Sequence, residues 1–144
     1  MYRVVCFILS LTPFPLNVCN YLISPNLGLA LWGGPEFEKL CRFFHPGVRL
    51  IDFSPDERHV VTWSPQPMEK NHTIAVWDIK TGSRLRTFAS PAIARAWPIF
   101  KWSPDGQFVA RISKGHIFVY VGETMELLEK RKINIPNVQV RFVA

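Results

Sequence analysis

The chain has 144 residues, of which 48% are hydrophobic, 13% aromatic and 19% charged. This composition is that of a packed globular protein; it excludes a disordered or collagen-like chain, and the length allows one domain at most. The formal net charge of +6 permits an anionic partner without requiring one. The cysteines are odd in number and form no CxxC pair, so we predict neither a disulfide framework nor a zinc knuckle and favour a reducing compartment; they are Cys6, Cys19 and Cys41.

The first 27 residues differ in character from the rest. Residues 4–11 are apolar except for Ser10, which could indicate the core of a short signal peptide. No small-residue cleavage motif follows cleanly, however, and no stretch reaches the ~20 apolar residues that a membrane-spanning helix needs. We therefore expect residues 1–27 to be a divergent segment at the edge of the core, with a weak strand at 21–24 and no membrane association.

Internal repeats dominate the sequence from Gly28 onward. Residues 48–64 and 97–113 match at an offset of 49, and the match includes a Ser-Pro-Asp triplet in each. A second family of segments begins at Ala30, Ala75 and Phe118, with offsets of 45 and 43. The offsets differ because the loop at 65–72 is longer than its counterpart, as surface loops often are. The residues that recur in register are Ser54, Pro55, Asp56 with Ser103, Pro104, Asp105, and Trp32 with Trp77 and Tyr120.

Each repeat is predicted to form four short strands. Serine followed by proline favours a type I turn, so the Ser-Pro-Asp triplet should end the first strand and start a hairpin. The last stretch of the second unit, 123–132, could form a helical turn or two, but its register with 82–88 favours a strand. The predicted strands are 49–53, 59–63, 73–78 and 82–88 in one unit, and 98–102, 108–112, 116–121 and 123–132 in the next.

A four-stranded unit that repeats every 43 to 49 residues is typical of a β-propeller blade, and Trp77-Asp78 is itself the WD dipeptide. We predict an all-β fold, a partial WD-repeat-like β-propeller over 28–144. It would contain two whole blades, at about 48–88 and 97–132, and parts of the flanking ones. Because propellers generally close with about four to eight blades, the chain should be a fragment, a truncated product or a piece that needs partner blades.

Catalytic chemistry finds little support in the sequence. No metal-ligand spacing or phosphate loop occurs, and the aspartates fall at repeated positions, which indicates architecture. We therefore predict no catalytic, cofactor-binding or metal-binding residue and no small-molecule substrate. Each histidine lies by a predicted turn or strand end, and we expect solvated or capping roles for all four: His45, His59, His72 and His116.

Basic residues gather along the predicted outer strands and could form a positive stripe that meets phosphate. Charge on an outer strand also blocks edge-to-edge pairing, and we prefer that interpretation. Aromatic residues at strand positions are expected in the core rather than on an RNA-stacking platform. The basic groups are Lys80, Arg84 and Arg86; Arg95 and Lys101; and Lys130, Arg131 and Lys132. The aromatic residues are Phe53, Trp63, Trp77, Trp102 and Tyr120.

Three runs of sequence go beyond the generic repeat: LALWGGPEF, HPGVRLIDFSPDERHVVTWSP and WPIFKWSPDGQFVARIS. In these runs the sequence resembles a known family, the propeller in the B subunit of eukaryotic translation initiation factor 3, and the resemblance extends from about Gly28 to Arg141. The related propeller of initiation factor 2A shares a looser pattern and is the alternative within this group.

The resemblance implies a cytoplasmic, non-enzymatic scaffold without a cofactor. Its partners would be other subunits of initiation factor 3 and the small ribosomal subunit, through protein and rRNA. The expected contact residues are Lys130, Arg131 and Lys132. Three interpretations of the same fold remain open: a generic WD-repeat binding module, an initiation factor 2A-like protein, and a non-functional truncated product. From other classes, a secreted or membrane-associated binding protein and an enzyme remain as rivals.

Overall fold

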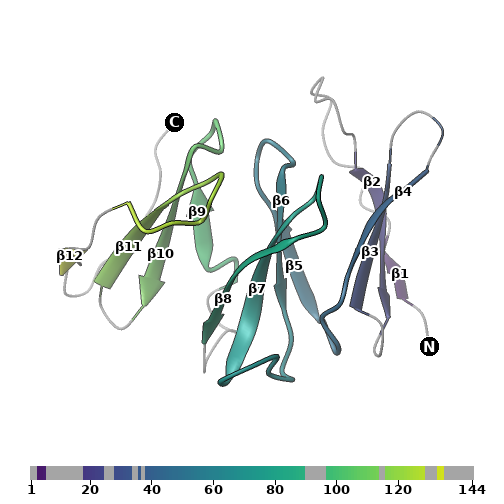
Figure 1. Cartoon of the computed structure of the whole chain (residues 1–144), viewed down its shortest axis with the longest axis horizontal. Helices are drawn as coiled ribbons and strands as arrows, with labels where there is room; N and C mark the ends of the chain where they lie inside the picture. The colour runs from purple at the N-terminus through teal and green to yellow at the C-terminus, as the bar shows by residue number, and fades with distance from the viewer. Residues whose placement is uncertain are drawn as a thin grey trace. The chain divides into compact units, whose positions relative to one another are not determined.

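The computed structural model describes residues 3–5, 18–24, 28–33, 36, 38–89, 97–113, 116–128 and 133–134, with side chains from residue 28 to residue 128. Strands and turns, with no helix, make up these residues. The strands form three four-stranded antiparallel sheets (Figure 1). The chain divides into two compact units, Met1–Ser90 with the first two sheets and Pro91–Ala144 with the third. The all-β, blade-like architecture predicted from the sequence is confirmed.

The first sheet has the order β1 (Arg3–Val5), β2 (Val18–Ser24), β3 (Gly28–Gly33) and β4 (Glu38–Phe43). Only a weak strand at 21–24 is expected before residue 28, whereas β2 begins at residue 18 and pairs with β3 along its length, apart from a local irregularity. The sheet thus extends across the boundary predicted after residue 27. The sequence repeat gives no signal there, because the first two strands diverge from their counterparts.

Repeat boundaries and strand boundaries agree closely in the second sheet. Its strands are β5 (Leu50–Phe53), β6 (His59–Trp63), β7 (His72–Asp78) and β8 (Arg84–Ala89), in that order. A register irregularity occurs between Val76 and Trp77 of the β7–β8 pair, and the first sheet has the same irregularity between Leu31 and Trp32. The register shift is therefore part of the repeat.

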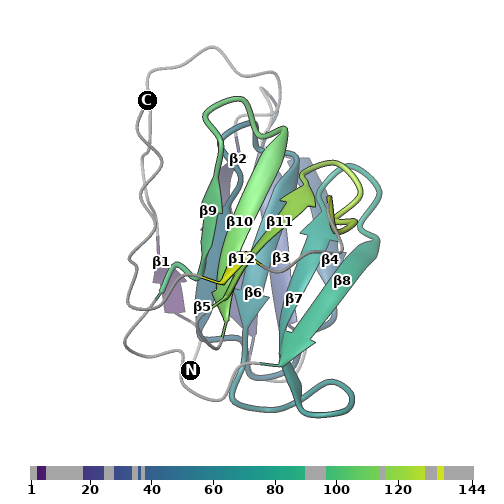
Figure 2. The ribbon, with the colours of Figure 1, turned by 90° about the vertical axis from the view of Figure 1, so that its left-hand side faces the viewer.

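The third sheet has the order β9 (Phe100–Trp102), β10 (Phe108–Ser113), β11 (His116–Val121) and β12 (Ile133–Asn134). Figure 2 shows β9, β10 and β11 side by side. The fourth strand differs from the predicted 123–132. Leu127 makes a single bridge to Tyr120, and the paired strand β12 comes later in the chain; residues 129–132 lie outside the described part.

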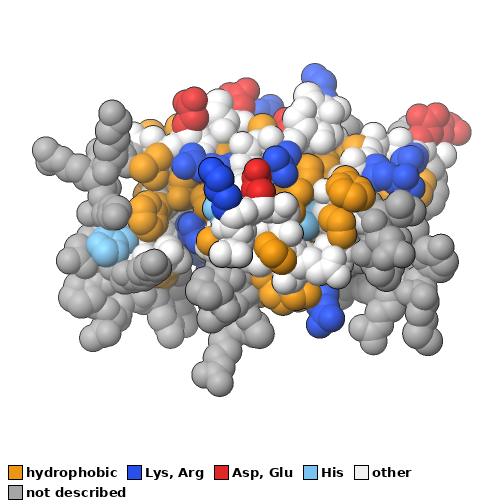
Figure 3. Space-filling model, turned by 60° about the horizontal axis from the view of Figure 1, so that its bottom comes forward, with side chains coloured by type: hydrophobic (Ala, Val, Ile, Leu, Met, Phe, Trp, Pro, Cys, Tyr) orange, Lys and Arg blue, Asp and Glu red, His pale blue; other side chains and the backbone are white. Residues whose placement is uncertain are grey.

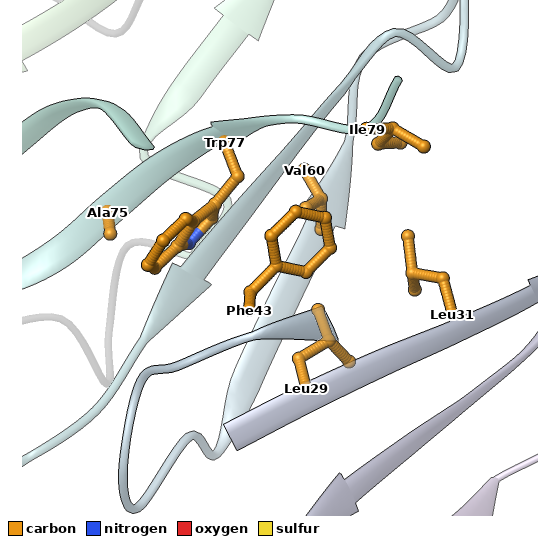
Figure 4. Close-up of a cluster of buried hydrophobic side chains, with 7 residues drawn as sticks. All are labelled: Leu29, Leu31, Phe43, Val60, Ala75, Trp77 and Ile79. Atoms are coloured by element: carbon orange, nitrogen blue, oxygen red, sulfur yellow. The ribbon is translucent and has the colours of Figure 1, made fainter. Parts of the chain in front are cut away.

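A hydrophobic cluster joins the first sheet to the second (Figure 4). Side chains on alternate positions of a strand point to the same face, so each sheet presents one apolar row to the other. The rings of Phe43 and Trp77 lie 5.3 Å apart between their centroids, a tilted contact across the two sheets. The cluster consists of Leu29, Leu31 and Phe43 from the first sheet with Val60, Ala75, Trp77 and Ile79 from the second or directly after it.

Candidate functional site

The two Ser-Pro-Asp triplets form the same turn in both units. The Ser54 hydroxyl donates to the Asp56 carboxylate at 2.6 Å and accepts from the His59 backbone N–H at 2.9 Å. The Ser103 hydroxyl donates to Asp105 at 2.6 Å and accepts from the backbone N–H of Phe108 at 2.9 Å. Pro55 and Pro104 are exposed in the two turns. Each serine hydroxyl therefore links the turn to the first residue of the hairpin's second strand.

Hydrogen bonding also favours the ionised form of Asp105 in the turn of the third sheet. The hydrogen bond from Ser103 and, to a smaller extent, the backbone N–H of Gln107 lower the pKa of Asp105 below its ordinary value. A carboxylate that accepts such bonds is stabilised in its charged form. Asp105 is thus an ionised acceptor of the turn.

Trp77 belongs to a buried chain of polar side chains. Its indole Nε1–H donates to Thr62 Oγ1 at 2.8 Å, and Thr62 Oγ1 lies 2.7 Å from His45 Nδ1. Sequence reasoning did not connect these three residues, because they are far apart along the chain and Thr62 directly follows two valines in its strand. Trp77 on β7 is thereby linked to β6 and to the segment that leads into the second sheet.

The predicted solvated or capping role of the histidines is wrong for two of them. His45 is 0% exposed and His59 is 2% exposed. Burial, with a smaller contribution from the Arg84 charge, lowers the pKa of His45 to about 4, so this imidazole is neutral at pH 7. His72 and His116 are half-buried, and His72 Nδ1 lies 2.6 Å from Thr87 Oγ1. Packing of neighbouring strands, which a single sequence does not display, covers the buried pair.

Asp78, the second residue of the WD dipeptide, shapes the turn that leads into β8. Its Oδ1 accepts the Thr81 backbone N–H at 2.6 Å and the Thr81 hydroxyl at 2.8 Å. Burial raises the pKa of Asp78, but the bonds from Thr81 act in the other direction, and the net shift is downward. Gly82 completes the turn with a φ of +70°, a conformation that glycine adopts without a steric penalty.

The other aromatic positions of the blade motif are less deeply placed. Tyr120 is buried at 4% exposure, whereas Trp32 and Trp102 are half-buried, as are Phe53 and Trp63. These side chains lie on the strands that sequence reasoning assigned to them. Their partial burial is compatible with packing between sheets.

Exposed basic side chains follow the edge strand β8. Arg84 forms an ion pair with Glu69 at 3.2 Å, and the Arg86 guanidinium lies 5.6 Å from the centre of the Phe88 ring. Figure 3 shows Lys and Arg side chains mixed with acidic and hydrophobic ones on the face that it presents. This mixture fits the protection of a sheet edge better than a uniform phosphate-binding stripe. Arg95 and the group Lys130, Arg131 and Lys132 lie outside the described residues.

The loop between β6 and β7 contains a well-defined turn just before β7. Lys70 and Asn71 both have positive φ, 44° and 64°, and the His72 backbone N–H donates to the Glu69 carbonyl at 2.6 Å. These features define a type I′ hairpin turn without the usual glycine. The loop and the edge strand β8 both carry exposed polar side chains.

Neither a metal centre nor a membrane-spanning helix occurs in the described part of the chain. No three side chains among His, Cys, Asp and Glu come together there as a metal-binding group. The described segments also contain no helix long and apolar enough to cross a membrane.

Repeated four-stranded sheets, a shared core between neighbours and a turn serine in two successive units define the class: the chain is a propeller-type repeat protein. No protein-family model matches it. It is 46% identical over 114 residues to the B subunit of eukaryotic translation initiation factor 3 from Xenopus laevis, covering 78% of this chain and 16% of that protein. It is 39% identical over 137 residues to the B subunit of the same factor from Mycosarcoma maydis, covering 77% of this chain and 18% of that protein.

One solved structure shares the fold. A crystal structure of a eukaryotic initiation factor superposes with a TM-score of 0.72 at 16% sequence identity, covering 92% of this chain and 35% of that one. The resemblance to the B subunit of initiation factor 3 stated from the sequence is thereby confirmed over about four fifths of the chain. The chain spans about a fifth or less of these curated relatives.

Proposed function

We propose that the chain serves as a scaffold element of translation initiation factor 3, in contact with other subunits of that factor and with the small ribosomal subunit in the cytoplasm. The observation that carries this proposal is the identity of 46% and 39% with the B subunit from two organisms. Identity at this level across whole repeats supports a shared role for the blades.

The geometry of the polar side chains supports contact rather than turnover. Among the sequence motifs, only the two Ser-Asp pairs resemble catalytic groups, and each serine hydroxyl donates a hydrogen bond to its aspartate within the turn. Ser54 is also buried, at 2% exposed. A nucleophile needs an accessible oxygen and an adjacent general base. We therefore assign these residues to architecture and the function to surface complementarity, without an enzymatic step or a cofactor.

Two surfaces are the proposed contact regions. One is the exposed loop at 65–71 with the edge strand β8, where Lys70 and Arg86 are solvent-accessible. The other is the basic group of Lys130, Arg131 and Lys132. Basic side chains that meet rRNA phosphates release counterions, so their contribution should fall as salt rises.

Capture from a cytosolic extract with the tagged full chain tests the proposal. At low salt we expect initiation factor 3 subunits and small-subunit ribosomal components among the bound proteins. Reversal of Lys130, Arg131 and Lys132 to Glu should lower their recovery several-fold, and the deficit should shrink at high ionic strength as wild-type binding also weakens.

A matched control carries the same change of charge on other exposed arginines, Arg42, Arg49 and Arg58, and should retain the captured components. Loss with both triple variants would assign the effect to overall charge and remove the basic group from the proposal. Recovery of no initiation-factor or ribosomal component by the wild-type chain at low salt would refute the scaffold role.

A further inference from the structure

Glu69 is held against the edge strand β8 by two side chains that bind one carboxylate oxygen. Arg84 Nη2 lies 3.2 Å from Glu69 Oε1, and the Thr87 hydroxyl donates to the same oxygen at 3.5 Å. His72 Nδ1 lies 2.6 Å from that hydroxyl. The side chains of Glu69 and Arg84 are 49% and 39% exposed, so the contact is open to solvent. We call these four residues the Glu69 cluster.

A register irregularity brings Arg84 and Thr87 to the same side of β8. Thr87 pairs directly with Ala75 of β7, and beyond the irregularity Arg84 pairs with the tryptophan of that strand, Trp77. Ala75 and Trp77 both belong to the cluster between the first two sheets and so share a face of β7. Because directly paired residues lie on one face of an antiparallel sheet, Arg84 and Thr87 share that face too. A regular strand would place residues at this spacing on opposite faces, whereas here both reach one carboxylate.

The backbone on both sides of Glu69 is fixed. Met68 packs against the hydrophobic cluster, and its backbone N–H donates to the His72 carbonyl at 2.9 Å. The His72 backbone N–H donates to the Glu69 carbonyl at 2.6 Å. The carboxylate can therefore leave Arg84 by rotation of the Glu69 side chain alone. Since solvent-exposed ion pairs gain little free energy from pairing, an anion from outside can compete for the guanidinium.

A phosphate oxygen matches the position that the carboxylate oxygen occupies. Guanidinium groups bind phosphate and carboxylate with the same fork geometry, and side-chain hydroxyls donate to phosphate oxygens in nucleic-acid complexes. Lys70 and Arg86, which adjoin Glu69 and Thr87 in the sequence, are exposed as well. Cations at more than one point of an edge suit the successive phosphates of an RNA strand better than a single phosphate group. The RNA backbone is therefore the ligand class that this edge favours.

We propose that the Glu69 cluster is a binding site for an RNA phosphate, in which the Glu69 carboxylate acts as an internal competitor. The carboxylate occupies Arg84 and Thr87 and lowers their affinity for external anions. An RNA phosphate that displaces it accepts from the Arg84 guanidinium and the Thr87 hydroxyl. The proposal rests on the ribosomal contact proposed above for the loop at 65–71 and β8, and it names the groups that meet the RNA there.

Fluorescence anisotropy of a labelled oligouridine with the full chain at low salt tests the proposal. Glu69→Gln keeps the size of the side chain and removes the competing charge, so it should bind the oligouridine about fivefold more tightly than the wild type. Glu69→Gln combined with Arg84→Gln should lose this gain, because the site then lacks its guanidinium. Glu123→Gln is the matched control: Glu123 is exposed in the other compact unit, and its replacement changes the net charge equally. It should bind like the wild type.

The charge of Arg84 also acts on the buried His45, so a second measurement leaves Arg84 in place. In NMR spectra of Glu69→Gln, the oligouridine should shift the backbone amide signals of His72 and Thr87, and those of the Ser103 turn should stay unchanged.

Equal affinity of Glu69→Gln and the wild type, or an equal gain with Glu123→Gln, would overturn the proposal. So would a gain of Glu69→Gln for a phosphoserine peptide without one for the oligouridine, because that pattern indicates a protein ligand. The binding assay contains no ribosome, so these results refute the RNA site and leave the scaffold role to the capture experiment. Failed capture by a chain whose Glu69→Gln variant gains RNA affinity would refute the scaffold role and retain the site.

Discussion

Glycine and non-glycine residues alternate at equivalent left-handed positions of the two complete units. After the Ser-Pro-Asp triplet, the left-handed position is held by Glu57 with φ +54° in the second sheet and by Gly106 with φ +72° in the third. At the turn before the fourth strand the order reverses, with Gly82 at φ +70° and Met125 at φ +57°. Both units thus keep the left-handed conformation at both turns. Glycine, the residue that suits this conformation best, occurs at only one of the two turns in each unit.

Glu57→Gly should stabilise the protein. A left-handed conformation costs a residue with a side chain about 1–2 kcal/mol, and glycine avoids this cost but loses more entropy on folding, so we expect a gain of about 1 kcal/mol. Urea unfolding monitored by tryptophan fluorescence measures it. Gly106→Ala, the reciprocal change, should destabilise by a similar amount, and equal stability for all three proteins would contradict the argument.

His45 should make stability dependent on pH. Its pKa in the folded chain is about 4, lowered from 6.5 by burial and then by Arg84. The unfolded state therefore binds more protons between these values, so the stabilisation is complete above about pH 6.5 and is lost as the pH falls toward 4. We expect a loss on the order of 2–3 kcal/mol across this window, measured by urea unfolding at a series of pH values.

The matched variant for this prediction is His45→Gln, which cannot titrate. The difference between wild type and His45→Gln isolates the contribution of this imidazole, since all other groups are common to both. The difference should shrink as the pH falls below 6.5. A difference that stays constant down to pH 4 would show that His45 titrates normally.

At the scale of elements, a backbone bond joins two hairpin turns in each complete unit. The Ile79 N–H donates to the Arg58 carbonyl at 2.8 Å, and the Gly122 N–H donates to the Gln107 carbonyl at 2.7 Å. Ile79 packs into the cluster between the sheets. At Gly122 a Cβ atom would lie 2.0 Å from the Gly106 carbonyl oxygen. The two turns of the third sheet are therefore closer than any side chain allows.

Gly122→Ala should consequently destabilise the third sheet. Because the obstacle is backbone, the two turns must separate, and we expect a loss of about 2–3 kcal/mol in thermal or urea unfolding. Gly82→Ala is the control: no atom lies within 4 Å of the position that its added methyl group would take, and only its positive φ opposes the change, at about 1 kcal/mol. If Gly82→Ala proved the more damaging, the close approach at Gly122 would not be the cause.

The sequence predicts the strands of the second sheet well because turn chemistry and the repeat coincide there. β6 and β11 have the predicted bounds. β1 and the start of β2 escape prediction, because the pairing of β1 with β2 and of β2 with β3 depends on backbone hydrogen bonds that any sequence can make. The chain of polar groups from Trp77 to His45 escapes for a related reason, since its members meet only after the sheets pack.

The first compact unit gains stability from the contact between its two sheets, as repeat proteins do. The first and second sheets share the cluster that contains Trp77, so loss of that ring would weaken both. The fold also outlasts sequence similarity: a TM-score of 0.72 accompanies only 16% identity in the solved initiation factor.

The ordered hairpin at Lys70-Asn71 makes the chain easy to label. The second sheet joins Trp63 to His72 through eight residues, whereas the third sheet joins Ser113 to His116 through two. An epitope or fluorophore inserted between Lys70 and Asn71 would extend outward from a turn whose stem is already hydrogen-bonded. Such a reporter would leave the apolar faces of the sheets untouched.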